Sequence, residues 1–125
     1  MISRAEVLMG RDKDAPLDRD LEDNLTKLLV ALNKFRDIYG KGMKVTSGYR
    51  PGSFNTAAGG AKKSNHMVCL ACDFHDPNGD LDAYCMSNLH VLEQCGLYLE
   101  HPDHTIGWCH LQCIAPKSGN RVFKP

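Results

Sequence analysis

The sequence of 125 residues contains no long apolar run, no charge surplus and no internal repeat. A transmembrane helix needs about 18 or more consecutive apolar residues, and no such stretch occurs. The 15 Lys and Arg residues balance the 15 Asp and Glu residues, so no basic excess favours nucleic acid as a partner. The first residues, MISRAE, lack the apolar segment of a signal peptide. We therefore expect synthesis in the cytoplasm and no ordinary secretion.

The six cysteines are many for this length but fewer than a disulfide scaffold requires. Thiols stay reduced in the cytoplasm, so we expect all six to be free. The length fits one domain, residues 1–125, with its own hydrophobic core. We expect this domain to be a monomer.

Helical periodicity is strongest between residues 21 and 38. Residues 14–18, DAPLD, are typical of a helix start, and Gly40 is a natural helix end. The apolar positions that predict one buried face are Leu21, Leu25, Leu28, Leu29, Leu32, Phe35 and Ile38.

A second helix is predicted over residues 81–95. Asp80 is its expected N-cap and Gly96 its expected end. The residues expected to face inward are Tyr84, Cys85, Leu89 and Leu92.

Short alternating segments predict strands at residues 43–47, 70–74, 97–100 and 108–114, the last two forming a hairpin. Single helical turns are expected near residues 4–9 and 54–58, and residues 115–125 read as a polar surface tail. The predicted fold class is α+β: a small antiparallel sheet with helices packed on one side.

Two histidines and one aspartate form the candidate metal site. His66 and Asp73 lie seven residues apart, and His110 stands in the apolar run WCHLQCI. Two imidazoles and a carboxylate are a common ligand set for catalytic zinc, with the fourth position open for water. A buried His110 needs a polar partner, which a metal or a backbone hydrogen bond would supply.

A rival interpretation is a structural zinc site built from Cys69-x-x-Cys72 and Cys109-x-x-x-Cys113. Side chains alternate across a strand, so Cys69 and Cys72 point to opposite faces, and such a site would need both faces at once. Cys72, Cys109 and Cys113 fall on apolar faces and should pack as small hydrophobes. The other histidines are expected to be solvated or structural.

Three segments resemble a family of zinc peptidases. Residues 64–74, SNHMVCLACDF, resemble its S-x-H-x-x-G-x-A-x-D-F signature, residues 47–50 its S-G-Y-R segment, and residues 108–110 its W-x-H segment. The family includes D-Ala-D-Ala carboxypeptidases, D-alanyl-D-alanine dipeptidases and phage L-alanyl-D-glutamate endolysins. Its fold is shared with the hedgehog signalling domain, and the short chain here looks most like phage or prophage members.

The resemblance implies that His66, Asp73 and His110 bind zinc. It implies that Arg50 contacts the substrate, either its carboxylate or the carbonyl under attack, because a guanidinium suits both. Ser64 would either hydrogen-bond close to the ligands or cap a loop.

Two positions depart from the family pattern. Cys69 replaces the glycine of the signature, and by strand alternation it would either face the metal side and crowd it or line the wall of the pocket. Gly107 replaces an acid that usually precedes the last histidine by three residues. The catalytic base would then come from elsewhere, and Glu100 is preferred over Asp103 and His104 because its strand pairs with that of His110.

The expected function is zinc-dependent hydrolysis of peptidoglycan stem peptides, at the cell wall after release from the cell. An alternative is a non-catalytic module, for example a virion component, that binds cell-wall peptide through the same zinc fold. The missing acid at Gly107 favours that alternative.

Overall fold

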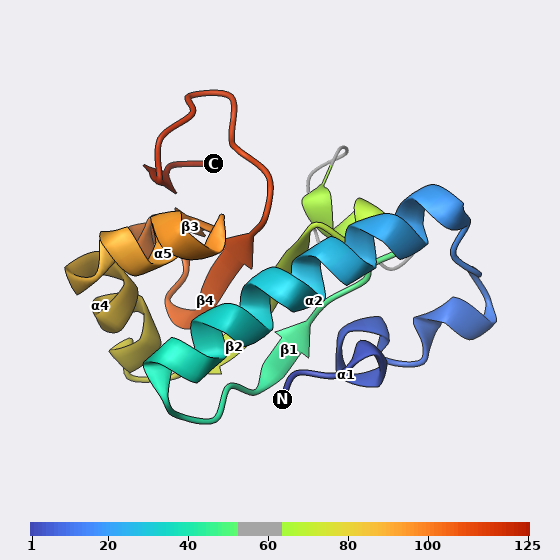
Figure 1. Ribbon diagram of the computed structural model, residues 1–125, viewed down its shortest axis with the longest axis horizontal. Helices are drawn as coiled ribbons and strands as arrows, with labels where there is room; N and C mark the ends of the chain where they lie inside the picture. Colours follow the sequence, from blue (N-terminus) through green and yellow to red (C-terminus); the bar gives the residue numbers. More distant parts are fainter. Residues whose placement is uncertain (53–63) are drawn as a thin grey trace.

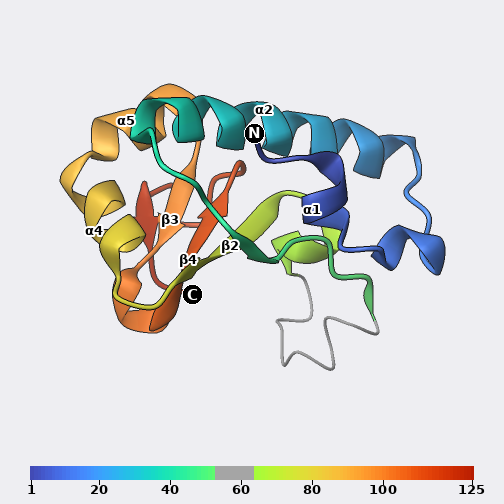
Figure 2. The same ribbon diagram turned by 90° about the horizontal axis from the view of Figure 1, so that it is seen from below.

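The computed structural model describes residues 1–52 and 64–125, which leaves the helical turn expected at residues 54–58 outside the described part. Within it, five strands form one sheet in the order β1-β2-β4-β3-β5. Helices α2 and α5 lie side by side along one face of that sheet (Figures 1 and 2). The predicted α+β class is confirmed.

The elements are α1 (Arg4–Leu8), η1 (Arg11–Lys13), α2 (Arg19–Tyr39), β1 (Val45–Ser47), η2 (Asn65–Val68), β2 (Ala71–Asp76), α4 (Asp80–Ser87), α5 (Leu89–Cys95), β3 (Tyr98–Glu100), η3 (Pro102–His104), β4 (Gly107–Gln112) and β5 (Val122–Phe123).

The long helix α2 supplies much of the core, as its periodicity predicts. Asp18 caps its start by accepting a hydrogen bond from the Leu21 amide, and Gly40 ends it with a left-handed φ of 77°. Ile38 was expected to face inward but is 41% exposed. The inward position of the last turn belongs instead to Tyr39, four residues after Phe35, and the two rings stack with centroids 6.0 Å apart. In the described residues no helix is both long and apolar enough to cross a membrane.

Strands β2 and β4 form the centre of the sheet. They pair antiparallel over six residue pairs, from Ala71 opposite Gln112 to Asp76 opposite Gly107. The expected hairpin of β3 and β4 is confirmed, with Tyr98 opposite Gln112 and Leu99 opposite Leu111. The face that carries Phe74, Cys109 and Leu111 is fully buried, so the opposite face is free to carry polar side chains.

The predicted helix over residues 81–95 is wrong in its continuity, because Asn88 divides it into α4 and α5. The Asn88 side chain donates to the carbonyl of Tyr84, four residues earlier. This bond competes with the helix ladder, a known effect of asparagine. Leu89, just after the break, is 39% exposed rather than inward-facing.

The start of α4 also differs from its prediction. Asp80 is not the cap. Gly79 takes that position with a φ of 74°, and the carboxylate of Asp76 accepts from the amides of Leu81 and Asp82. The end of β2 therefore anchors the start of α4.

The C-terminal residues are not simply a surface tail. β5 pairs parallel with β3, placing Val122 opposite Leu99 and Phe123 opposite Glu100. The Arg121 guanidinium lies 4.2 Å above the Tyr98 ring centroid and donates to the carbonyl of Leu97. These contacts fix the edge of an otherwise antiparallel sheet.

Candidate metal centre

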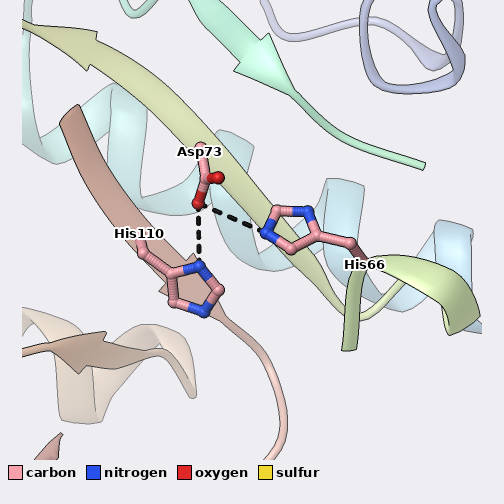
Figure 3. A group of neighbouring side chains, drawn as sticks. All are labelled: His66, Asp73 and His110. Atoms are coloured by element: carbon pink, nitrogen blue, oxygen red, sulfur yellow. Dashed lines mark hydrogen bonds and ion pairs between the residues drawn. The ribbon is translucent and has the colours of Figure 1, made fainter. Parts of the chain in front are cut away.

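The structure brings His66, Asp73 and His110 together. Each offers one ligand atom, and the three atoms lie within 4.8 Å of one another. Figure 3 shows both imidazoles directed at one carboxylate oxygen. Oδ1 of Asp73 is 3.3 Å from Nε2 of His66 and 2.8 Å from Nδ1 of His110. Both histidines are buried and the aspartate is partly buried.

His66 is oriented by the segment after β1. Its Nδ1 lies 2.9 Å from the carbonyl oxygen of Gly48. The backbone carbonyl of His66 accepts a hydrogen bond from the Arg50 amide. A carbonyl oxygen only accepts, so Nδ1 carries the hydrogen and Nε2 presents its lone pair to Asp73. Ser64 caps η2 by accepting from the His66 amide, so the loop-cap alternative for Ser64 holds.

Close packing against α1 requires glycine at position 48. A Cβ at this position would lie 2.1 Å from the Val7 carbonyl oxygen, and the Tyr49 amide donates to that same oxygen. The backbone of α1 thus approaches too closely for any side chain. Gly48 therefore allows α1 to pack closely and also directs its own carbonyl at His66.

Asp73 and His110 face each other across the sheet. They are directly paired in the register of β2 and β4, and paired residues project from the same face. The outer nitrogen of His110, Nε2, lies 2.8 Å from Oε1 of Gln112. Gln112 is buried and donates from its own nitrogen to the carbonyl of Ile114.

The electrostatics of the three residues depend on one another. Burial alone would raise the pKa of Asp73, but its contacts with His110 and His66 hold that pKa well below its usual value. Burial would lower the pKa of His110, but the Asp73 carboxylate raises it, because only the protonated ring can donate from Nδ1 to that carboxylate. The carboxylate is therefore anionic across the physiological range.

The donor set fits a divalent metal of the zinc type. Each imidazole gives its outer N–H to a protein acceptor, which turns its other nitrogen and lone pair toward Asp73. Two lone pairs and a carboxylate converging on one point repel each other unless a proton or a cation lies between them. Two histidines and one carboxylate match three-ligand zinc sites, and their outer hydrogen bonds are typical of metal-binding histidines.

The three candidates for the base differ in position. Glu100 follows Leu99, whose partner on β4 is Leu111, so one residue further the register brings Glu100 opposite His110. Glu100 is half-buried. Burial raises the pKa of Glu100. The charge of His110 lowers that pKa, and the charge of Asp73 raises it further. The carboxylate therefore lies within electrostatic reach of the metal centre.

Asp103 and His104 lie in η3 and are not brought to the three ligands. The Asp103 side chain is 83% exposed and approaches His101 Nδ1 at 3.6 Å. It borders a cavity of about 450 Å³ that Asp82 and Gly107 also line. Gly107 has a φ of 93°, a conformation that disfavours the acid usual at this position.

Arg50 is held beside His66 through its backbone, whose amide donates to the His66 carbonyl at 3.0 Å. Its Nε is buried without a hydrogen-bond partner among the described residues. A buried donor of this kind is costly unless something binds it.

The cysteines lie apart from this centre. All six are free and buried, and no cysteine joins a metal-ligating group in the described part of the chain. The strand alternation applied to Cys69 is wrong, because β2 begins at Ala71 and Cys69 ends η2 with a φ of 59°. The thiol is fully buried, and burial raises its pKa to about 12. A left-handed φ explains why glycine suits this position of the signature.

Two residues of the site escaped sequence analysis. The alternation of β4 places Gln112 on the face of His110 but predicts no role for it. Phe123 lay in the expected surface tail, yet its ring meets His110 edge-on with centroids 6.1 Å apart. The alternation of β4 could have pointed to Gln112, whereas no local signal indicates that β5 returns to the site.

A comparison with protein-family models identifies the relatives of this chain. The model described as Peptidase M15 matches residues 3–106. The chain belongs to the peptidase M15 family. The M15 match includes His66, Asp73 and Glu100 and ends before His110, so the family match does not cover the third residue, which the geometry of the site adds. Members of the M15 family are metallopeptidases, which implies a hydrolase. No similar curated protein and no similar solved structure is found.

Proposed function

We propose that this M15 chain is a zinc peptidase that hydrolyses peptidoglycan stem peptides, with zinc held by His66, Asp73 and His110. The observation that carries the proposal is the convergence of these three ligand atoms within 4.8 Å in a chain of this family. Bound zinc would lower the pKa of water towards ~7 and polarise the scissile carbonyl.

The protein's own residues supply the proton transfers and the orientation of the substrate. The Glu100 carboxylate accepts the proton of the attacking water and returns it to the leaving amine. Its raised pKa, caused first by burial, suits a group that must both take and release a proton. Arg50 donates to the substrate carboxylate or to the carbonyl oxygen under attack, using the buried Nε that has no partner among the described residues.

The proposed substrates carry D-alanine or D-glutamate next to the cut bond, as the resemblance implies. The test is incubation of the zinc-loaded protein with purified peptidoglycan and two defined stem peptides. One ends in D-Ala-D-Ala and the other contains the L-Ala-D-Glu bond. Mass spectrometry of the products identifies the bond that is cut, and His110→Ala is the inactive control.

Cleavage of either peptide by the wild type and not by His110→Ala supports the proposal. Zinc binding without cleavage of any cell-wall substrate would instead favour the alternative function, a non-catalytic module that binds cell-wall peptide. Sedimentation with insoluble peptidoglycan then measures that binding directly. How the protein reaches the wall is part of the same proposal, as release of a phage-type enzyme or as a virion component.

A further inference from the structure

Gln112 is a buried amide at the end of β4, two residues beyond His110 on the same face of the strand. It is only 3% exposed. A buried amide is costly unless it is hydrogen-bonded. Both of its polar atoms are paired: Oε1 lies 2.8 Å from His110 Nε2, and its nitrogen donates to the Ile114 carbonyl at 2.9 Å.

These two contacts fix the direction of the amide and, through it, the tautomer of His110. The Ile114 carbonyl only accepts, so the amide nitrogen faces Ile114 and the oxygen faces the imidazole. The amide oxygen also only accepts, so His110 Nε2 carries the hydrogen. A neutral imidazole has one N–H, which leaves the Nδ1 lone pair directed at Asp73 Oδ1, 2.8 Å away.

The two histidines reach the same result by different means. The partner of His66 is the backbone carbonyl of Gly48, and this selects Nε2 as the inner nitrogen. The partner of His110 is a side chain, and it selects Nδ1. The opposite choice at two adjacent rings, whose centroids are 5.2 Å apart at 67°, lets both lone pairs meet the same carboxylate. The arrangement at His110 depends on a side chain and can therefore be altered by substitution.

We propose that Gln112 is a positioning residue that selects Nδ1 of His110 as the metal-ligating atom. This inference rests on the proposed zinc site. Without the acceptor at residue 112, the imidazole loses both its preferred tautomer and the bond that holds its ring plane. Loss of such an outer hydrogen bond typically weakens metal affinity by about 10–100-fold.

The test combines two measurements on Gln112→Met, which keeps the length of the side chain but removes its acceptor. Imidazole ¹⁵N NMR of the metal-free protein in alkaline buffer reports which nitrogen of His110 carries the hydrogen. Competition with a chromophoric chelator reports zinc affinity. We expect hydrogen on Nε2 in the wild type, a mixture in Gln112→Met, and zinc affinity about 10–100-fold lower in that variant.

Two further variants separate positioning from general damage to the fold. Gln112→Glu keeps an oxygen acceptor and should restore the wild-type tautomer and most of the zinc affinity. Asn33→Leu removes a partly buried amide of α2, which accepts from the Ile2 amide and donates to the Ile2 carbonyl and has no contact with the three proposed ligands among its hydrogen bonds. It should lower the melting temperature and leave zinc affinity unchanged.

The outcomes distinguish the two proposals. Wild-type His110 with its hydrogen on Nδ1 would overturn the role of Gln112 even if Gln112→Met fails to fold. Unchanged tautomer and zinc affinity in Gln112→Met would overturn that role alone and leave the peptidase proposal intact. A wild type that binds no zinc would overturn the proposed function, and with it the selection of a metal ligand by Gln112.

Discussion

Glu100 stands one residue beyond the paired Leu99 and Leu111, so the hairpin register, continued by one residue, places it in the row of His110. On the other side of His110, the next strand places Asp73 in the same row, and β5 adds Phe123 beside Glu100. Residues in one row of a sheet project from the same face. A single row thus holds two of the three proposed ligands, the proposed base and an aromatic ring.

This row predicts the effect of Glu100→Gln, which keeps the shape of the side chain but cannot accept a proton. Hydrolysis of stem peptide should fall by roughly 10²–10⁴-fold, the usual range for general acid–base catalysis. Zinc content and melting temperature should stay close to those of the wild type, because Glu100 is not among the three proposed ligands and is only half-buried.

The matched controls are Asp103→Asn and His104→Gln, the two other candidates for the base, which lie in η3 and not in the sheet. Both should retain most of the activity in the same kinetic assay. Full activity in Glu100→Gln together with its loss in Asp103→Asn would move the base into the loop.

Gly48→Ala should be destabilising and should weaken zinc binding as well. The new Cβ would meet the Val7 carbonyl oxygen at 2.1 Å, a backbone atom that cannot move without displacing α1. The shift would also carry away the carbonyl that orients His66. Overpacking of this kind typically costs about 1–3 kcal/mol. Chemical denaturation and a zinc titration measure the two effects, and wild-type values in both would contradict the close approach.

Cys69→Gly should be more stable than Cys69→Ala by about 1 kcal/mol, the cost of a left-handed conformation for a residue with a Cβ. Both variants lose the buried sulfur and differ from each other by the Cβ, the atom that makes a φ of 59° unfavourable. Urea denaturation of the pair measures it. Greater stability of the alanine variant would mean that this residue does not adopt the left-handed conformation.

Asp82 should give the protein a specific pH dependence of stability. Burial raises its pKa from 3.8 to about 6. Its Oδ2 accepts from Thr105, and its Oδ1 has no partner among the described residues. Between these two pH values the unfolded chain ionises Asp82 while the folded protein keeps the proton. Its contribution to stability is therefore complete below about pH 3.8 and is lost as the pH rises through about 6.

Asp82→Asn removes this titration. Relative to the wild type, its free energy of unfolding should rise between pH 4 and pH 6 and level off above that range, as measured by urea denaturation at each pH. A constant difference between the two proteins across this range would contradict a raised pKa at Asp82.

Local patterns in the sequence predict the fold wherever a long period or a strong cap exists. The helix α2 has five turns of apolar spacing between Asp18 and Gly40, and its bounds follow from these signals. The break at Asn88 is not visible in the same way, because it depends on one side-chain hydrogen bond to Tyr84 within a periodic stretch. The strand β5 is two residues long and exists only through its pairing with β3.

The site likewise contains residues that the sequence predicts and residues whose role depends on the final packing. His66, Asp73 and His110 could be predicted because residue type, order and spacing carry the chemistry of a metal site. The importance of Gln112 and Phe123 could not, since it arises from contacts to His110 that the final packing creates. Cys69 shows the converse error: an alternation valid within a strand was extended to a residue that lies before the strand.

The most direct test of the proposed metal centre is the zinc content of the purified protein and of three single variants, measured by atomic emission on samples prepared without chelator. We predict one zinc ion per chain in the wild type and loss of most of it in His66→Ala, Asp73→Ala and His110→Ala, because three protein ligands leave no redundancy. Full zinc content in any two of these variants would contradict the assignment of the centre to these residues.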